Sequence, residues 1–287
     1  MKTLVGAVIL GSLLCAPVLA LADDDARDYI PAPPGTSLFI TYFKHSFGHK
    51  LYGDGDVQSD DFNLVQNVAI LRPVYFTKIG PFVADPQVLI PAGNAEVDTG
   101  GAHLSANGIS DPILVSTIWL VNNPDTKTWF GVTPFLTVPI GAYDNKRPLN
   151  MGANRWAFKG EAGFVKGLGA KTYWDLIAAY EIYGNNNDYG ADSTTKKQEG
   201  VATLETHLSY DLAKDIYAAV DYFYHVGGET EVDGEKQHDA LNNHAAQVTV
   251  GMGIASSYQL LVQYRSDFAV KSGPKTDTFG VRLLHVF

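Results

Sequence analysis

The chain closes with the stretch Phe279-Gly280-Val281-Arg282-Leu283-Leu284-His285-Val286-Phe287. Every second position from Phe279 to Phe287 is bulky, whereas Gly280 and Arg282 between them are small or polar, with Leu284 and Val286 as exceptions. Alternation with a period of two places the bulky side chains on one face of a β-strand. The stretch therefore predicts a final strand with one face turned to an apolar environment.

A final strand of this kind resembles the C-terminal assembly signal of bacterial outer-membrane β-barrels, which would make the barrel-assembly machinery a partner. The residues that carry this resemblance are Phe279, Val281, Leu283, His285 and Phe287. The alternative is an ordinary edge strand that ends a soluble β protein, and the tail alone does not separate the two.

The other end of the chain predicts export. Residues 1–22 hold one early cation, Lys2, an apolar run over residues 4–14 and the small-x-small pattern Ala20-Leu21-Ala22, as a removable signal sequence does. The run is too short to span a bilayer, and no later stretch reaches about 18 unbroken apolar residues. We therefore expect a signal sequence at 1–22, a periplasmic extension at 23–35 and one barrel domain over 23–287.

Composition excludes several classes of function. The single cysteine, Cys15, lies in the predicted signal, so the mature chain would have no disulfide framework and no Cys-metal site. The net charge of −10 gains nothing from counterion release on a nucleic acid, which excludes that partner. A hydrophobic fraction of 46% suits a soluble domain and a membrane barrel equally.

Strand and loop spacing favours a transmembrane antiparallel β-barrel of about twelve strands. Five short turns, at 78–80, 122–126, 166–170, 211–215 and 255–257, alternate with long polar loops at 46–61, 91–111, 141–154, 184–200 and 226–243. An even strand count, short periplasmic turns and long outer loops are typical of bacterial outer-membrane barrels. The predicted strands are residues 36–45, 62–76, 81–90, 112–121, 127–140, 155–165, 172–183, 201–210, 216–225, 244–254, 258–265 and 276–287.

Prolines make the first half of this assignment less regular. A proline lacks the N–H that a strand ladder needs, so strands that contain one are expected to be bulged or short. Counts of ten or fourteen strands stay open. Solutes could leave into the periplasm or sideways into the bilayer, and the sideways route would need a break in the wall at these strands. The residues are Pro73, Pro81, Pro86, Pro91, Pro112, Pro134 and Pro139.

The polar face of the strands is predicted to be the lumen. A Lys or Arg that faced lipid at mid-membrane would cost about 2–4 kcal/mol. Outward aromatics gather near strand ends, as the headgroup belts of a membrane barrel favour, although aromatics of a soluble core are the alternative. The inward residues, which either cross-link the wall by ion pairs or set a field for solutes, are Arg155, Lys159, Glu161, Asp175, Glu181, Glu205, His207, Asp221, Gln263, Arg265 and Arg282.

Three ordered motifs extend the argument to a family. They are Gly108-Ile109-Ser110-Asp111-Pro112-Ile113-Leu114, Pro139-Ile140-Gly141-Ala142-Tyr143-Asp144 and Leu149-Asn150-Met151-Gly152-Ala153-Asn154-Arg155-Trp156. With Pro33-Pro34-Gly35-Thr36, this set resembles the transporter family of the MetA pathway of phenol degradation. The resemblance implies an outer-membrane channel for small, hydrophobic or aromatic solutes.

Asp111 and Asp144 have two readings. Both lie at the loop-side ends of predicted strands, where they could line the mouth of the pore. Turn chemistry is the favoured alternative, because Asp beside Gly, Pro or Asn is a common turn former.

No catalytic constellation stands out. His207, Ser209 and Glu205 are spaced by two on one strand, which places them in a row instead of around a reacting atom. Asp54, Asp56, Asp60 and Asp61 lack the Gly and Glu positions of an EF-hand loop. We therefore expect no enzyme, no cofactor and no metal, with a lipid or ester hydrolase barrel and a purely structural barrel as alternatives.

Overall fold

The computed structural model describes residues 23–287, and the predicted signal sequence lies outside the described residues. Every regular element in residues 23–287 is a β-strand. No helix in this part of the chain has the length and apolar character to cross a membrane.

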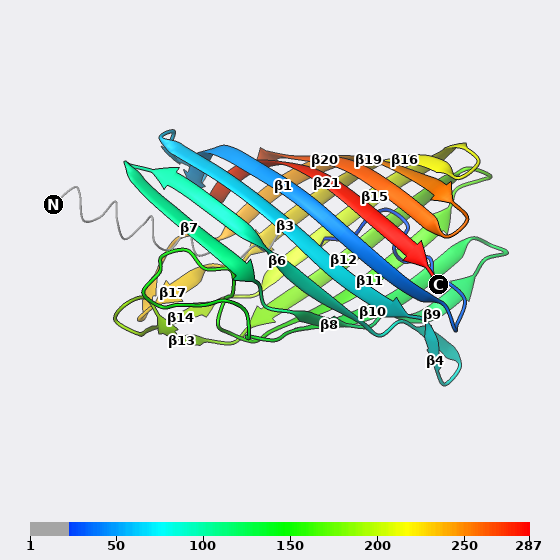
Figure 1. Cartoon of the computed structure of the whole chain (residues 1–287), viewed down its shortest axis with the longest axis horizontal. Helices are drawn as coiled ribbons and strands as arrows, with labels where there is room; N and C mark the ends of the chain where they lie inside the picture. The colour runs from blue at the N-terminus through cyan, green and yellow to red at the C-terminus, as the bar shows by residue number, and fades with distance from the viewer. Residues whose placement is uncertain (1–22) are drawn as a thin grey trace.

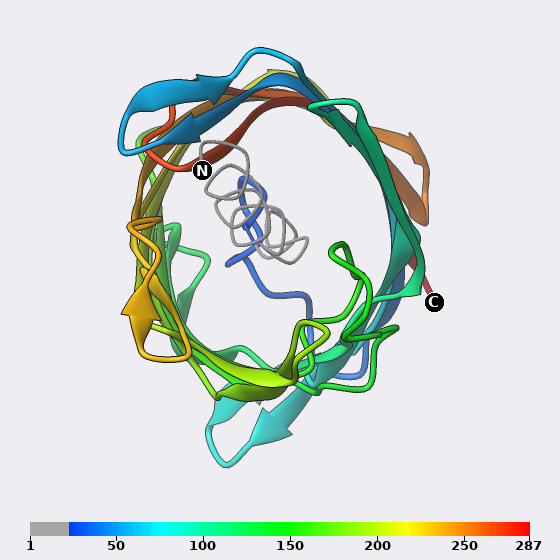
Figure 2. The same cartoon turned by 90° about the vertical axis from the view of Figure 1, so that its left-hand side faces the viewer.

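The strands close into a twelve-stranded antiparallel barrel, which confirms the predicted fold class. Strand β1 (Ser37–Gly53) pairs with β3 (Phe62–Tyr75) on one side and with the final strand β21 (Gly273–Val286) on the other, so the sheet has no outer edge there (Figures 1 and 2). The other long strands are β6 (Gln87–Thr99), β10 (Thr128–Thr137), β11 (Ala157–Gly167), β12 (Thr172–Tyr183), β15 (Val201–Ala213), β16 (Ile216–Gly227), β19 (Leu241–Ala255) and β20 (Tyr258–Ala269).

The fourth position of the wall is divided among three short strands. Strand β8 (Ile113–Val115) pairs with both neighbours, β6 and β10, and β9 (Ile118–Asn123) continues along β10. Strand β7 (Ala102–Ile109) pairs with β6 alone among the strands of residues 23–287. At the turn end, the fourth position of the wall is therefore hydrogen-bonded to a strand on each side. At the loop end, β7 is hydrogen-bonded to β6 but not to β10.

One predicted strand, 81–90, was wrong, as was the loop predicted at 91–111. Strands β4 (Thr77–Ile79) and β5 (Phe82–Ala84) form a small hairpin at the turn end, and the long strand β6 begins only at Gln87 (Figure 1). Residues 91–111 hold the rest of β6 and β7. Their outer ends bury apolar side chains such as Val97 and Ala106 and expose polar ones such as Glu96. The apolar-outward pattern is therefore reversed there, while the backbone ladder continues.

The long loops carry structure of their own. Strands β13 (Asn186–Tyr189), β14 (Thr194–Gln198), β17 (Thr230–Val232) and β18 (Glu235–Lys236) form a four-stranded sheet at the loop end, and β2 (Asp56–Ser59) pairs with the end of β1. This sheet joins two loops that the sequence pattern left irregular.

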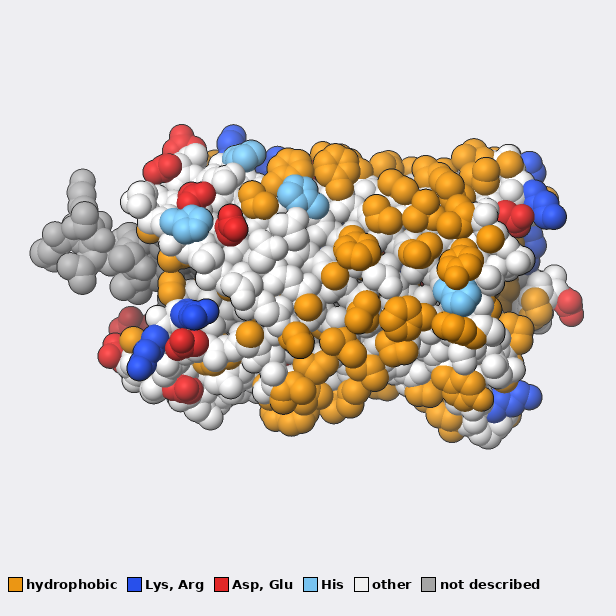
Figure 3. All heavy atoms as spheres, viewed as in Figure 1, with side chains coloured by type: hydrophobic (Ala, Val, Ile, Leu, Met, Phe, Trp, Pro, Cys, Tyr) orange, Lys and Arg blue, Asp and Glu red, His pale blue; other side chains and the backbone are white. Residues whose placement is uncertain are grey.

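The outer surface carries a broad apolar band (Figure 3). On β16, Val220 is 63% exposed while its neighbour Asp221 is 1% exposed, and the same alternation runs along the other long strands. Of the predicted aromatic belts, Trp156, Tyr210, Tyr258, Tyr264, Phe279 and Phe287 are exposed, and Trp174, Tyr222 and Tyr224 are half-buried. Hydrocarbon is the solvent that such an exterior requires.

Candidate solute path through the barrel

The N-terminal plug, residues 23–32, lies inside the barrel (Figure 2). Ala26 and Tyr29 are 1% and 3% exposed. The chain leaves the lumen at the turn end, where Gly35 N donates to Phe76 O at 2.7 Å. The expected periplasmic extension over 23–35 is corrected here, because its charged side chains find partners on the inner wall.

Asp23 anchors the start of the plug. It forms an ion pair with Arg265 and lies 3.0 Å from His225 Nε2. Burial alone would raise the pKa of Asp23, but the positive charges of Arg265 and His225 outweigh burial and hold this pKa well below its usual value.

Arg282 on the final strand holds the middle of the plug. Its Nη1 atom donates to Asp25 at 2.8 Å and to Asp28 at 2.7 Å, and Asp28 also lies 3.4 Å from Arg72. Gln263 Nε2 donates to Asp25 at 2.5 Å. The buried Asp25 and the half-buried Asp28 are thus paired with two arginines across the interior, as charges withdrawn from water require.

Arg27 points the other way, toward β12, β15 and β16. Its guanidinium lies between the rings of Tyr173 and Tyr217, at 4.4 and 4.3 Å from their centroids. Its polar contacts are Asp175 to the backbone N at 2.5 Å, Ser209 to Nε at 2.8 Å and Asp211 to Nη1 at 2.7 Å.

Tyr29 occupies a niche made by two glycines. Gly131 and Gly163 are paired across β10 and β11, and a Cβ atom on Gly163 would run into the Tyr29 ring. The Tyr29 hydroxyl lies 2.7 Å from Thr133 Oγ1 and donates to Glu161 Oε1 at 2.8 Å. The Tyr29 ring of the plug is thereby in direct contact with the inner face of β10 and β11.

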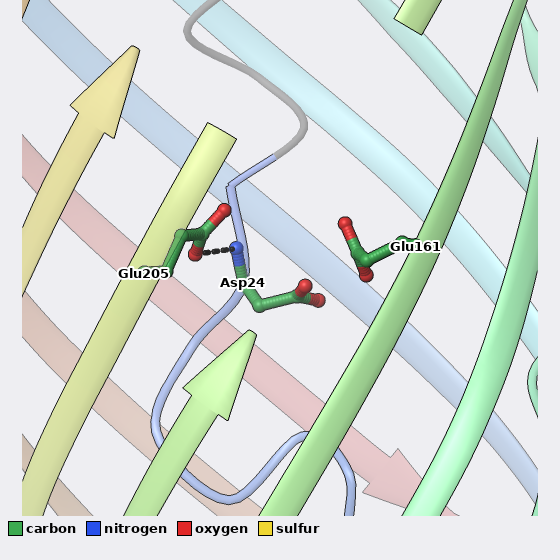
Figure 4. Close-up of side chains that lie close together, drawn as sticks. All are labelled: Asp24, Glu161 and Glu205. Atoms are coloured by element: carbon green, nitrogen blue, oxygen red, sulfur yellow. Dashed lines mark hydrogen bonds between the residues drawn. The ribbon is translucent and has the colours of Figure 1, made fainter. Parts of the chain in front are cut away.

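Three carboxylates meet beside the plug (Figure 4). Oxygen atoms of Asp24, Glu161 and Glu205 lie within 4.8 Å of one another, and Asp24 N donates to Glu205 Oε2 at 3.0 Å. Lys159 Nζ donates to Glu161 at 2.7 Å. Burial, together with the charges of Glu161 and Glu205, raises the pKa of Asp24 well above its usual value. The arrangement therefore favours the protonated form of Asp24.

The structure also places His207 within a wall network. Its Nδ1 atom lies 2.9 Å from Asp221 and its Nε2 atom 3.6 Å from Glu205. His207 is 0% exposed, and Ser209 accepts its hydrogen bond from Arg27. These residues pack the interior without an open site for a reacting substrate.

The predicted inward residues therefore come together mostly as partners of the plug and of one another. Nine of the eleven are buried, and Glu181 and Arg265 are half-buried. Their role in solute passage stays a prediction. The residues that sequence reasoning missed are Asp23, Asp25, Arg27, Asp28 and Tyr29. The dense charge of residues 23–28 was the available signal for the first four.

Asp111 and Asp144 both take part in loop structure. Asp111 is 8% exposed, and its two carboxylate oxygens accept from Gly141 N and Ala153 N, each at 2.7 Å. It therefore joins the three sequence motifs at one point. Asp144 is exposed and accepts from Lys146 N at 3.0 Å, which is turn chemistry.

A cavity of about 870 Å³ lies at the turn end, between the plug and the wall. Its lining is apolar at Leu38, Val74, Phe76 and Leu284 and charged at Arg27, Asp28, Arg72 and Arg282. This amphipathic vestibule is separated from the loop end by the plug.

A closed barrel with an apolar exterior and a polar, plugged lumen defines an outer-membrane channel, located in the bacterial outer membrane. The chain belongs to the family described as "Putative MetA-pathway of phenol degradation", whose model matches residues 48–283. The family resemblance noted in the sequence is thereby confirmed.

Solved structures agree with this assignment. The COG4313 outer membrane channel from Pseudomonas putida F1 is 29% identical, with a TM-score of 0.88 over 92% of this chain and 100% of that one. The β domain of the Bordetella autotransporter BrkA, at 8% identity and a TM-score of 0.55 over 89% of this chain and 100% of that one, shares the fold alone. No curated protein matches the sequence.

Proposed function

We propose that this channel takes up small hydrophobic or aromatic solutes across the outer membrane, by passive or facilitated diffusion. The name of its family, which refers to phenol degradation, supports the aromatic class. The observation that carries the proposal is the one-sided pairing of β7, because it marks a place where an apolar solute can leave the lumen through the wall.

The plug argues against a wide aqueous path along the axis. Its acids and Arg27 are bonded to six strands of the wall, β3, β12, β15, β16, β20 and β21, and Tyr29 is seated between β10 and β11. A hydrophilic solute that crosses along the axis would have to displace this network. An apolar solute that enters at the loop end leaves the network in place if it passes sideways through the wall before it reaches the plug.

The seam beside β7 suits such an exit. Segment 138–142 lies against the end of β7, where Ala142 N donates to Ile109 O at 2.8 Å. Two apolar side chains there are turned outward, Ile109 at 54% and Ile140 at 73% exposed. The segment is held by a few hydrogen bonds instead of a full ladder, so its opening costs less than separating two paired strands.

A channel is favoured over the hydrolase alternative. His207 is bonded to Asp221 and enclosed, which gives it no room to act on a lipid or ester. A purely structural barrel is the other alternative, and uptake measurements separate it from a channel. We further propose that residues 1–22 are removed on export, that lipid surrounds the apolar band and that the assembly machinery reads the final strand.

The test is uptake of radiolabelled toluene by bacterial cells with an intact lipopolysaccharide layer, with and without the protein. We expect faster toluene uptake in cells that carry it and unchanged uptake of glucose. Equal toluene uptake in both cell types would contradict the proposal. Faster glucose and toluene uptake together would indicate an unselective pore.

A further inference from the structure

One arginine of the described chain differs from the others. Across residues 23–287 there are six arginines, and five have a carboxylate within 4.0 Å: Arg27, Arg72, Arg147, Arg265 and Arg282. Arg155 has none, although it is 5% exposed. A buried charge without a carboxylate at ion-pair distance is costly, so the Arg155 site can still accept an anion.

The guanidinium of Arg155 is held in place but only partly used. Its Nη2 atom donates to Gln198 Oε1, and its Cζ atom lies 4.6 Å from the centroid of the Tyr183 ring. Its Nη1 atom is buried and has no hydrogen-bond partner among the described residues. Two strands, β12 and β14, therefore orient a donor whose acceptor is missing.

That arginine lines a small pocket at the loop end. The pocket has a volume of about 30 Å³, and Lys196, Asn186, Tyr143 and Tyr189 also line it. Lys196 is 5% exposed, with its Nζ atom 5.0 Å from the centroid of the Tyr189 ring. Two buried cations and no acid surround a space large enough for a carboxylate group but too small for an aromatic ring.

The pocket is built before any ligand arrives. Asn186 Nδ2 donates to Tyr143 Oη at 3.0 Å and to Ala153 O at 3.2 Å, and Asn186 Oδ1 accepts from Asn154 at 3.0 Å. Asp111 fixes Ala153 from the opposite side. A preorganised cationic pocket binds an anion without the cost of ordering its own side chains.

We propose that this pocket binds the carboxylate of aromatic acids, and that it captures such solutes at the loop end before they pass the barrel. The proposal rests on the proposed uptake function and adds an anionic subclass to its solutes. The carboxylate accepts from Arg155 Nη1 and is attracted by Lys196, while the ring stays outside the pocket. The protein has a net charge of −10, which repels anions in general. An anionic solute is therefore held only where cations are gathered, as they are in this pocket.

The test measures binding of benzoate and of its neutral isostere benzamide to the full chain in detergent, by saturation-transfer NMR. We expect benzoate to bind at least tenfold more tightly than benzamide. In Arg155→Gln this ratio falls to about one, and Lys196→Gln lowers it in part. The matched control is Arg147→Gln, which removes an equal charge from the same loop, where Arg147 is exposed and paired with Asp144. This control should keep the full ratio.

Binding to Arg155→Lys and binding of phosphate separate the charge of Arg155 from its role in folding. Arg155→Lys, which retains the charge, should recover part of the ratio if charge and not folding is responsible. The proposal is overturned if benzoate and benzamide bind wild type equally, or if benzoate binds Arg155→Gln as tightly as wild type. It is also overturned if phosphate binds through Arg155 and benzoate does not. Toluene uptake by wild-type cells is measured separately, so either proposal can fail alone.

Discussion

Replacing Arg27 with alanine should release the plug without touching the wall. The change removes the guanidinium that lies between Tyr173 and Tyr217 and bonds to Ser209 and Asp211, whereas the backbone N–H bond to Asp175 is kept. The barrel strands themselves are unaltered, so the variant is expected to assemble normally.

The expected loss follows from these contacts. A hydrogen bond to a charged group contributes about 1.5–3 kcal/mol, and a cation–π contact roughly 0.5–1 kcal/mol at a partly exposed site. The Arg27 and Asp211 side chains are 19% and 33% exposed, so their ion pair is screened and contributes only about 0.2–1 kcal/mol. A total of about 3 kcal/mol shifts the docking equilibrium of the plug by roughly 100-fold.

Single-channel recording in planar lipid bilayers measures this shift. The fraction of time spent in a high-conductance state should rise by roughly 100-fold in Arg27→Ala and by less in Arg27→Lys, in line with the free energy above. Lys214→Ala removes an equal charge from an exposed turn at the same end and should leave conductance unchanged. Identical currents from Arg27→Ala and wild type would refute the plug as the barrier.

Three other changes test separate contacts. Burial, Glu161 and Glu205 raise the pKa of Asp24, so the contribution of Asp24 to docking is fully present below the ordinary Asp pKa of about 4 and is lost as pH rises through the raised value. The open fraction should therefore increase as pH rises through that value in wild type, and Asp24→Asn should flatten this dependence. Gly163→Ala pushes a Cβ atom into the Tyr29 ring and should raise conductance. Gly160→Ala on the same strand adds a Cβ atom that meets nothing within 4 Å and should leave conductance unchanged. Equal currents from the two variants would count against the Tyr29 niche. Asp111→Ala leaves the N–H groups of Gly141 and Ala153 without acceptors and should speed their hydrogen exchange roughly 100-fold, as measured by mass spectrometry. Unchanged exchange would show that Asp111 does not hold these two segments together.

Alternation along the second half of the chain was enough to predict the barrel. In β16 the pattern of Val220 and Asp221 alone identifies which face meets lipid, because only one of them tolerates hydrocarbon. The short turns between these strands fixed their order around the wall. The final strand β21 closes on β1, as the pattern ending at Phe287 indicated.

Features that depend on distant partners were beyond the sequence pattern. The sequence left open whether the acids of residues 23–28 enter the lumen, since nothing local shows that Arg265 and Arg282 face them. Strand β6 was misplaced because its outer half reverses the pattern, with Ala95 and Val97 buried inward and Glu96 exposed. Asp111 looked like a turn residue, and only the structure shows that it holds Gly141 and Ala153 together.

The side exit beside β7 is tested most directly by closing it. A Cβ atom on Gly108 would lie 2.9 Å from Ala142 Cβ, so Gly108→Cys with Ala142→Cys needs a shift of about 1 Å to reach disulfide geometry. Each single cysteine is the control, since Gly108 has a φ of +133° that strains any replacement. The account predicts that toluene uptake falls at least tenfold when the disulfide forms and returns on reduction. Unchanged uptake with the disulfide fully formed would contradict it.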